Sequence, residues 1–385
     1  MHFKHLALTT LVGAASAQTQ NLNATLAGNN NTSGLAAFLG QYSSLLQSLN
    51  SLSNITVLAP SNQALTAALN SSVGQALSKD PNAVQALFQY HVLNGTHFAS
   101  SITNISSFIP SLLTDQSYTN VTGGQVVEAV KIGNQTAFFS GLLQNATISQ
   151  TDLNFTGGVI HVIDNLLTLP LNVSDSATAT NLTALNGALN ATSLTKTVNE
   201  AHDVTIFAPN NDAFQSIGSA LENMTTNELT GILSYHVISG GKVGYSSTLI
   251  NGTSLKTVQG GNITIHIENG TVFVNSAKVL TPDILVANGV IHIIDNVLNP
   301  NNTSVAPSSS ATAGSPAYTS ASKASGVPFT SGQPTPTTTI NPTSAGAGPA
   351  STRVSSSSKA AAVPMKTGAV GAAALFGAGA VLLNY

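Results

Sequence analysis

The sequence predicts an α+β fold, built as two tandem copies of one module. Three observations predict it. Three short motifs recur in the same order along the chain, amphipathic helical patterns lie early in the copies, and β-branched runs lie late. Helices gathered before strands in this way favour an α+β domain.

The recurring motifs are short, and each stands in both halves of the chain. They are Thr-Val-Leu-Ala-Pro-x-Asn (56–62) and Thr-Ile-Phe-Ala-Pro-x-Asn (205–211), Tyr-His (90–91 and 235–236), and Gly-Val-Ile-His-x-Ile-Asp (158–164 and 289–295). The distance between matching positions shrinks along the chain, so the second copy has shorter loops. The shared order indicates a tandem duplication, with one domain over 18–169 and the other over 170–300.

Helical patterns are clearest in the first copy. Between Leu35 and Leu49, apolar residues recur at i, i+3, i+4 and i+7, which places them on one face of a helix. A second helix is expected over 82–90, with Pro81 at an N-terminal position and Asp80 as its cap.

Strand patterns close each copy. Isoleucines alternate over 263–267, Asn269-Gly270 marks a tight hairpin turn, and valines alternate again over 272–274. The run Val-Ile-His-Val-Ile at 159–163 is continuously apolar apart from its histidine, and the run at 290–294 matches it. Such runs are typical of strands that are buried on both faces.

Both ends of the chain predict processing. Lys4 and the apolar run Leu6–Val12 precede Ala15-Ser16-Ala17, a small-x-small pattern, so residues 1–17 are interpreted as a secretory signal peptide. A buried N-terminal helix is the alternative interpretation. At the other end, a small-residue run, a spacer and an apolar tail over 369–383 follow the order of a glycosylphosphatidylinositol (GPI) signal.

The expected GPI propeptide covers 359–385, and the attachment candidates are Ser356, Ser357 and Ser358. A plain transmembrane helix is the alternative, but such helices usually need about 20 consecutive apolar residues. Between this signal and the second domain, residues 301–358 are rich in Ser, Thr and Pro. Such a segment cannot bury enough surface to offset its ordering entropy, so a disordered C-terminal stalk is expected.

Composition narrows the class of protein. The chain has no Cys and only 6% charged residues, so each domain needs a core of its own and therefore upwards of ~100 residues. All acidic residues lie between Asp80 and Asp295, where only lysines supply positive charge and are outnumbered. Nucleic acid is not an expected partner, because phosphate binding needs a clustered basic surface.

Sugar is the expected source of solubility. The sequence holds 20 Asn-x-Ser/Thr sequons, an excess over chance that predicts a heavily glycosylated secreted protein. The acceptor residues are Asn23, Asn30, Asn31, Asn54, Asn70, Asn94, Asn104, Asn120, Asn134, Asn145, Asn154, Asn172, Asn181, Asn190, Asn223, Asn251, Asn262, Asn269, Asn301 and Asn302.

Together the three motifs resemble the fasciclin domain, and the resemblance covers about Leu35 to Leu298. It implies two tandem fasciclin-like domains, each a β-sandwich wedge with packed helices. It also implies adhesion or matrix contact, without catalysis or an obligatory cofactor. With the two targeting signals, the chain is similar to GPI-anchored fungal cell-surface members of that family. The second copy keeps the family's Asn-Asp-Ala-Phe turn at 211–214, whereas the first has Asn-Gln-Ala-Leu at 62–65.

The motif residues are the candidate functional residues. His161 and His292 lie in apolar runs, with Asp164 and Asp295 three positions later, so internally hydrogen-bonded histidines are expected rather than catalysis or metal binding. Pro60, Asn62 and Pro209 are likewise expected to support the fold rather than to bind a ligand. No zinc-ligand spacing and no nucleophile elbow is present, so neither a metal site nor an enzyme is predicted.

The resemblance supplies the candidate recognition residues. In animal members of the family the Tyr-His region is associated with receptor contact, which by position gives Tyr90, His91, Tyr235 and His236. Their apolar neighbours also suit core packing, and this structural interpretation is the favoured one. Asn211 and Asp212 of the family turn complete the candidates.

The expected location is the extracellular face of the plasma membrane or the cell wall. The expected partners are protein or glycan components of the surface, wall or matrix, and the membrane through the GPI lipid. A carbohydrate- or lipid-binding module that organises the wall is the alternative function.

Overall fold

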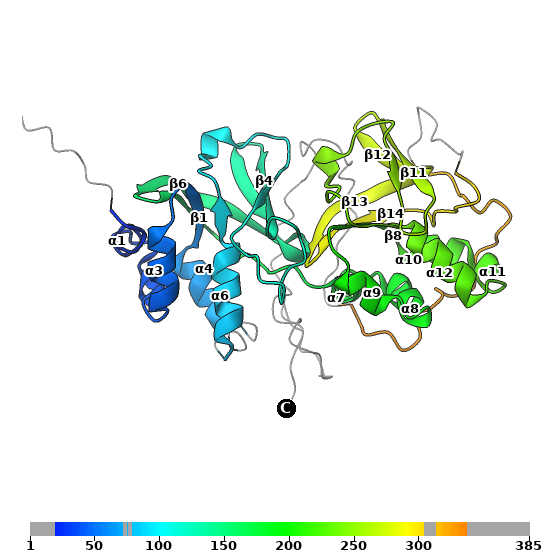
Figure 1. Cartoon of the computed structure of the whole chain (residues 1–385), viewed down its shortest axis with the longest axis horizontal. Helices are drawn as coiled ribbons and strands as arrows, with labels where there is room; N and C mark the ends of the chain where they lie inside the picture. The colour runs from blue at the N-terminus through cyan, green and yellow to red at the C-terminus, as the bar shows by residue number, and fades with distance from the viewer. Residues whose placement is uncertain (1–19, 72–74, 76–78, 304–312, 337–385) are drawn as a thin grey trace, which may run out of the picture.

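A computed structural model describes residues 20–71, 75, 79–303 and 313–336. The predicted signal peptide (1–17), the attachment serines (356–358) and the GPI propeptide (359–385) lie outside the described residues. In the described part, two domains of the same architecture stand side by side (Figure 1).

The first domain begins with helices and ends with strands. Its helices are α1 (Leu22–Ala27), α2 (Ser33–Leu39), α3 (Ser43–Ser51), α4 (Asn62–Leu69), α6 (Pro81–Tyr90) and the 3-10 turns η1 (Ala99–Ser101) and η2 (Gly141–Leu143). Its strands are β1 (Ile55–Pro60), β2 (Val92–Asn94), β3 (Ser107–Pro110), β4 (Val126–Ile132), β5 (Gln135–Phe139), β6 (Asn145–Phe155) and β7 (Gly158–Ile163).

The second domain repeats this order. Its helices are α7 (Val173–Ala179), α8 (Thr183–Ala191), α9 (Thr195–Glu200), α10 (Asn211–Ser216), α11 (Gly218–Leu221), α12 (Thr226–Tyr235) and the 3-10 turn η3 (Ser246–Thr248). Its strands are β8 (Val204–Pro209), β9 (Val237–Ile238), β10 (Ser254–Lys256), β11 (Asn262–Glu268), β12 (Thr271–Val274), β13 (Ala277–Val286) and β14 (Gly289–Ile294).

Within the described residues, each domain holds one seven-stranded sheet that nearly closes on itself. The strand order is β2-β1-β7-β6-β5-β4-β3 in the first domain and β9-β8-β14-β13-β12-β11-β10 in the second. The edges of the first sheet meet at a bridge between Leu93 and Ser111. In the second, Val258 N–H donates to Val237 O across 2.8 Å. The predicted α+β class is therefore confirmed, with the wedge formed by one curled sheet and packed helices.

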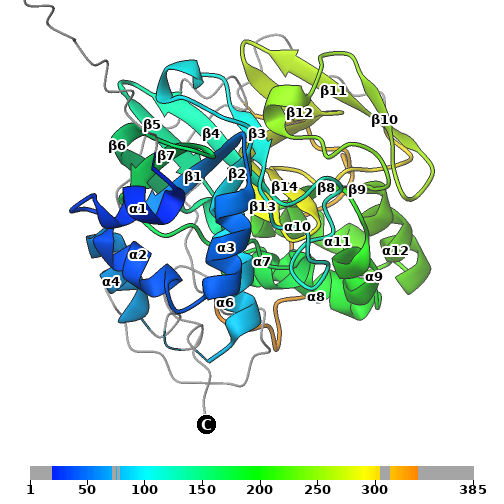
Figure 2. The ribbon, with the colours of Figure 1, turned by 60° about the vertical axis from the view of Figure 1, so that its left-hand side comes forward.

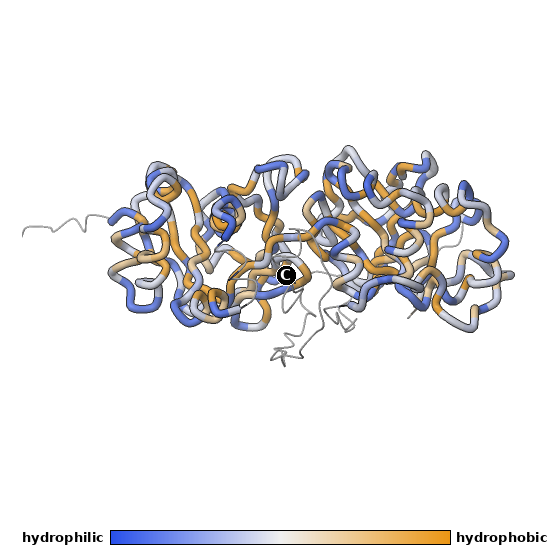
Figure 3. Tube along the Cα trace, turned by 90° about the horizontal axis from the view of Figure 1, so that it is seen from below, coloured by the Kyte–Doolittle hydropathy of each residue, from blue (hydrophilic) through white to orange (hydrophobic). Residues whose placement is uncertain are grey.

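The two motif strands form the parallel pair at the centre of each sheet. β1 pairs with β7 so that Leu58 faces His161, and β8 pairs with β14 so that Phe207 faces His292. All six residues of β1, β8 and β14 are buried, as continuous apolar runs predict. In Figure 3 hydrophobic stretches of the chain run through the inside of each domain, and many hydrophilic stretches lie at its outside.

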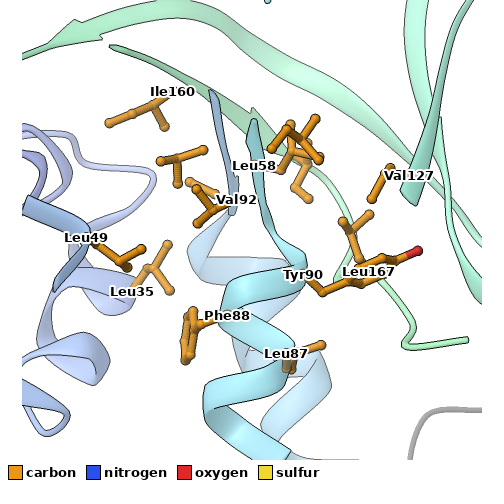
Figure 4. Packing of buried hydrophobic residues seen from close by; sticks show 14 of the residues in the cluster. Leu35, Leu49, Leu58, Leu87, Phe88, Tyr90, Val92, Val127, Ile160 and Leu167 are labelled. Atoms are coloured by element: carbon orange, nitrogen blue, oxygen red, sulfur yellow. The ribbon is translucent and has the colours of Figure 1, made fainter. Parts of the chain in front are cut away.

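Helices cover the sheet on the side that carries the apolar cluster. Leu35, Leu49 and Phe88 pack from the helices toward Leu58 and Ile160 of the sheet (Figure 4). In both domains the helices lie along the same side of the pair (Figures 1 and 2).

Several local predictions are confirmed. α6 begins at Pro81, and the Asp80 carboxylate accepts from the N–H groups of Asn82 (3.0 Å) and Ala83 (3.3 Å). The turn between β11 and β12 has Asn269 at φ 51° and Gly270 at φ 78°, the left-handed pair that a two-residue hairpin requires.

The single helix predicted from Leu35 to Leu49 is wrong. The pattern is shared by α2 and α3, which are separated at Gly40, and the N–H of Gly40 closes α2 by donating to Ala36 O (3.0 Å). The periodicity survives the break because both helices pack on the same core.

The predicted stalk also needs correction at its start. Residues 313–336, inside the expected 301–358 stalk, lie against the second domain, with Ala317 6% exposed and Phe329 packed on the core. Tyr318, Ala321, Val327 and Phe329 of this segment pack against the hydrophobic core of the second domain, and their apolar surface holds the segment there. Residues 337–358 lie outside the described part.

The domains share a packed interface. Val126 of β4 clusters with Tyr245, Leu285 and Val290 of the second domain. Thr122 donates from its N–H (2.8 Å) and its hydroxyl (2.6 Å) to the Asp203 carboxylate. Apolar burial and direct hydrogen bonds therefore join the two domains.

Candidate functional site

The Tyr-His histidines connect a helix end to the segment after the central strand. His91 caps α6, its Nδ1 lies 2.8 Å from Leu87 O, and its Nε2 lies 2.9 Å from Leu167 N. The carbonyl accepts and the amide donates, so Nδ1 carries the proton and Nε2 is the acceptor. His236 repeats this with Ile232 O (2.7 Å) and Leu298 N (2.9 Å).

The surroundings of these two histidines favour the neutral ring. Burial lowers the pKa of His91 and of His236 to about 4, and this outweighs the carbonyl that each ring contacts, which acts to raise the pKa. Protonation would turn Nε2 into a donor that faces another donor. His91 and His236 thus make the same structural contact in the two domains.

The tyrosines of the motif are buried as well. Tyr90 is 0% exposed and donates to Val126 O (3.0 Å), and in Figure 4 its ring lies beside Leu167. Tyr235 is 0% exposed, donates to Asn262 O (2.6 Å) and accepts from Asn275 Nδ2 (3.1 Å).

The candidate residues Tyr90, His91, Tyr235 and His236 therefore lie in the domain interiors and not on a recognition surface, as the favoured core-packing interpretation predicts. Their hydrogen-bond partners lie inside their own domains, and none of the four is more than 3% exposed. The apolar neighbours that suited core packing gave the better indication, because they place the dipeptide where helix and sheet meet.

The central-strand histidines contact a loop rather than the aspartates that follow them in sequence. His161 Nε2 donates to His97 O (2.7 Å), and Nδ1 accepts from Asp152 N (3.3 Å). His292 repeats this with Gly244 O (2.7 Å) and Asp283 N (3.3 Å). Burial lowers the pKa of His161.

Asp152 and Asp283 are structural residues that sequence reasoning missed. Each lies at an irregularity of the register in β6 or β13, at φ 57° and φ 62°. Asp152 accepts from Ala99 N (3.0 Å), and Asp283 accepts from Ser246 N (2.8 Å). Each carboxylate thereby holds a 3-10 turn against the sheet; their shared placement nine residues before the strand histidine was the available signal.

Asp164 and Asp295 bind elsewhere, at the ends of β7 and β14. Asp164 accepts from Thr147 N and Oγ1 (both 2.6 Å), and Asp295 accepts from Lys278 N (2.8 Å). Each carboxylate thus joins the end of the central strand to its antiparallel neighbour. Pro60 and Pro209 are buried at the ends of β1 and β8, where a strand gives way to a helix.

The asparagine of the first motif fastens two helices together. Asn62 Oδ1 accepts from Gly34 N (2.8 Å), and Asn211 Oδ1 accepts from Ala184 N (3.0 Å). The half-buried Asn211 amide is thus engaged within the domain, whereas Asp212 is exposed. Of the candidate recognition residues, Asp212 alone has an exposed side chain.

The sequon asparagines all lie within the described residues. None is buried: fifteen are exposed, and Asn23, Asn120, Asn145, Asn172 and Asn302 are half-buried. They occur in both domains, so glycans on them would cover much of the pair.

The motif geometry agrees with the comparison to known families. The fasciclin-domain model matches residues 30–170 and 180–300. The chain belongs to the fasciclin family.

Curated relatives of the same family match most of the chain. A fasciclin-like arabinogalactan protein of Arthroderma benhamiae is 36% identical over 80% of this chain and 73% of its own length. The fasciclin-like arabinogalactan protein elcF of Phaeosphaeria nodorum is 32% identical over 76% of this chain and 92% of its own. A solved FAS1 domain pair of the insect cell adhesion molecule fasciclin I is 20% identical, with a TM-score of 0.34, over 71% of this chain and 98% of that one.

Neither a metal cluster nor a membrane-spanning helix occurs in the described part of the fasciclin pair. Among the residues that the structure describes, no group of three or more His, Asp or Glu side chains gathers as a metal ion would require. None of the helices in the same part of the chain combines the length and apolar character needed to cross a membrane.

Proposed function

We propose that this chain is a non-catalytic cell-surface protein that mediates adhesion or contact with cell-wall or matrix components. The observation that carries the proposal is the pair of fasciclin domains packed against each other, in a chain whose relatives bear the name fasciclin-like arabinogalactan protein. The engagement of both ring nitrogens of the four motif histidines with protein groups supports a non-catalytic role.

The sequons support a place outside the cell. An acceptor asparagine must reach the oligosaccharide transferase, and none of the twenty is buried. We further propose that the secreted chain is held at the outer face of the plasma membrane by a GPI lipid attached among Ser356, Ser357 and Ser358, or passed from there to the wall.

The adhesion proposal is tested in cells that lack the protein. We expect these cells to attach to surfaces less than the parent strain does, and to aggregate less. Re-expression of the full chain should restore both properties. Normal adhesion, aggregation and wall assembly under all conditions would contradict the proposal. Binding of the secreted chain to glycan arrays or lipid vesicles, with normal adhesion in the deletion strain, would favour the alternative wall-organising module.

Within this proposal, Asp212 is the candidate contact residue of the second domain. It is exposed at the start of α10, beside the engaged Asn211. The variant Asp212→Ala should reduce adhesion without lowering the melting temperature. Gln63→Ala, at the matching exposed position of the first domain, is the control. Equal adhesion by all three proteins would remove Asp212 from the contact surface.

Attachment to the membrane has its own experiment. Intact cells are treated with phosphatidylinositol-specific phospholipase C, and the released protein is measured by immunoblot. We expect release from membranes, or release by glucanase if the chain has been transferred to the wall. Replacing Ser356, Ser357 and Ser358 with leucine should abolish attachment. Protein that resists both enzymes would contradict the proposed lipid anchor.

A further inference from the structure

We propose that the helical face of the second domain is a docking groove for an extended peptide, filled in this chain by its own residues 313–336. This stretch, here called the strap, is the orange segment of Figure 1, and it has no helix or strand. Its residues 322–333 lie along α10, α11 and α8. Its first residues bond to the sheet instead, where Gly314 N donates to Asp295 (2.7 Å) and Ser315 N donates to Ser276 O (2.9 Å). The inference does not depend on the proposed adhesion role.

The groove holds the main chain of the strap by paired hydrogen bonds. Gln215 O accepts from Ala324 N (2.9 Å), and Gln215 Nε2 donates to Ala324 O (3.1 Å). Ser219 N donates to Ser322 O (3.1 Å), and Ser219 Oγ accepts from Ser322 N (2.8 Å). Because both groups of each strap residue are engaged, these contacts recognise an extended backbone and tolerate small side chains.

Two helical glycines let the strap approach closely. A Cβ at Gly187, in the middle of α8, would overlap the main-chain oxygen of Phe329. A Cβ at Gly218, at the start of α11, would overlap the side chain of Ala324. Neither glycine has the positive φ that would explain its presence, and glycine is a poor residue inside a helix. Space for the strap is the remaining reason for both.

An aromatic contact fixes the register of the strap. Phe329 meets Phe214 edge-on, with ring centroids 6.3 Å apart and an interplanar angle of 83°. Phe214 is the aromatic residue of the Asn-Asp-Ala-Phe turn, and it is 1% exposed. Beyond it, Asn186 Nδ2 donates to Gln333 Oε1 (3.1 Å). The groove thus favours small residues at positions 322 and 324 and a phenylalanine at 329, while the exposed Lys323 between them leaves that position open.

The first domain lacks this groove. When Asn62 is aligned with Asn211, and Gly34 with Ala184, the positions of the two glycines carry Ala37 and Leu69. Both are exposed, and Leu69 is one of the exposed large apolar side chains. Thr66 replaces Gln215, and its hydroxyl donates to Asn62 O (2.7 Å). The docking face is therefore particular to the second domain.

The strap covers the surface that a partner of the groove would contact. A partner that approached Phe214 or Gln215 would first have to displace residues 313–336. A displacing partner should carry the chemistry of the strap, namely small residues where Ser322 and Ala324 lie and an aromatic residue where Phe329 lies.

The test cuts the covalent link and asks whether the strap stays. A protease recognition sequence is inserted within 304–312 of the full chain, the purified glycoprotein is cleaved, and the products are separated by size exclusion. We expect the C-terminal fragment to elute with the domain pair. We expect at least a tenfold loss of co-elution in Gly187→Val, and no loss in Ala37→Val, the matched change in the first domain.

Two further measurements keep the outcome decisive. Phe329→Asp alters only the strap and should release the fragment while the melting of the first domain is unchanged. Excess synthetic peptide 313–336 should displace the cleaved fragment. Separation of the fragment from the folded parent, or retention in both Gly187→Val and Phe329→Asp, would overturn the groove. A dimer of the uncut chain that Phe329→Asp dissociates would overturn the assignment within one chain, since two copies would then exchange straps.

Discussion

The ring of Phe108 in the first domain stacks on the ring of Tyr245 in the second, with centroids 4.1 Å apart and an interplanar angle of 11°. Tyr245 is buried at 8% exposure, and Gln125 nearby donates from Nε2 to Val286 O across 3.0 Å. An apolar stack beside a buried hydrogen bond makes the interface resemble a domain interior, so the two fasciclin domains should move as a unit.

Removing that stack should loosen the pair. Tyr245→Ala deletes a buried ring and its aromatic contact, so we expect a loss of about 2–4 kcal/mol in the free energy of unfolding. The radius of gyration should also rise. Chemical denaturation and small-angle X-ray scattering measure these two effects.

Two variants serve as controls for the stack. Tyr245→Phe keeps the ring and removes a hydroxyl that is buried without a partner among the described residues, so its stability should equal or exceed that of the parent. Phe98→Ala changes the residue that precedes the matching 3-10 turn of the first domain, and Phe98 is 44% exposed. A stable, compact Tyr245→Ala protein would contradict the interface.

The Tyr-His histidines should make stability depend on pH. The unfolded chain titrates near the ordinary histidine pKa of 6.5, whereas burial lowers the folded pKa of His91 and His236 to about 4. Between these values the unfolded state binds more protons, so stability falls as pH falls from about 6.5 to about 4. The full effect is roughly 3 kcal/mol for each histidine.

The histidine contribution is isolated by difference. His91→Gln and His236→Gln should each lower stability at pH 7.5, because glutamine lacks the ring geometry that bonds the carbonyl of Leu87 or Ile232 and the later amide at the same time. Each should also reduce the slope of stability against pH between pH 6.5 and 4, as thermal melts across that range would show. Profiles parallel to the parent in both variants would show that these rings do not titrate as inferred.

The motif asparagine should matter for stability and its neighbour should not. Asn211→Ala removes the bond to Ala184 N that ties α10 to α8, and we expect a loss of about 1–2 kcal/mol. Asp212→Ala changes an exposed side chain and should stay within about 0.5 kcal/mol of the parent. Urea denaturation of both variants gives the comparison, and equal effects would contradict the assigned roles.

The glycine that opens β14 should be irreplaceable. Gly289 has φ 153°, and a Cβ there would overlap Val204 O in the paired strand β8, so Gly289→Ala should cost several kcal/mol or prevent secretion. Gly231 lies inside α12 with no neighbour within 4 Å of an added Cβ, so Gly231→Ala should stabilise by about 0.5–1 kcal/mol. Secretion yield and thermal melting report both, and a well-secreted, stable Gly289→Ala protein would contradict the strand pairing.

Helix starts and turns were predictable from the sequence where a few adjacent residues determine them. Asp80 and Pro81 indicated the start of α6, and Asn269-Gly270 indicated the β11–β12 turn. The break at Gly40 was not predictable from periodicity, because α2 and α3 place their apolar residues on the same core. Likewise, the composition of residues 301–358 indicated a stalk, although Phe329 and its neighbours find a surface to pack on.

The sequence by itself determined that two copies of a fasciclin domain follow each other, since three motifs in a fixed order are a property of the chain. Only the tertiary structure decided what those motif residues contact. His161 lies three residues before Asp164 but bonds to the Asp152 main chain and to His97 O, since a residue that is distant in sequence becomes the neighbour across the sheet. The Phe108–Tyr245 stack has the same origin, because only folding of both copies brings these rings together.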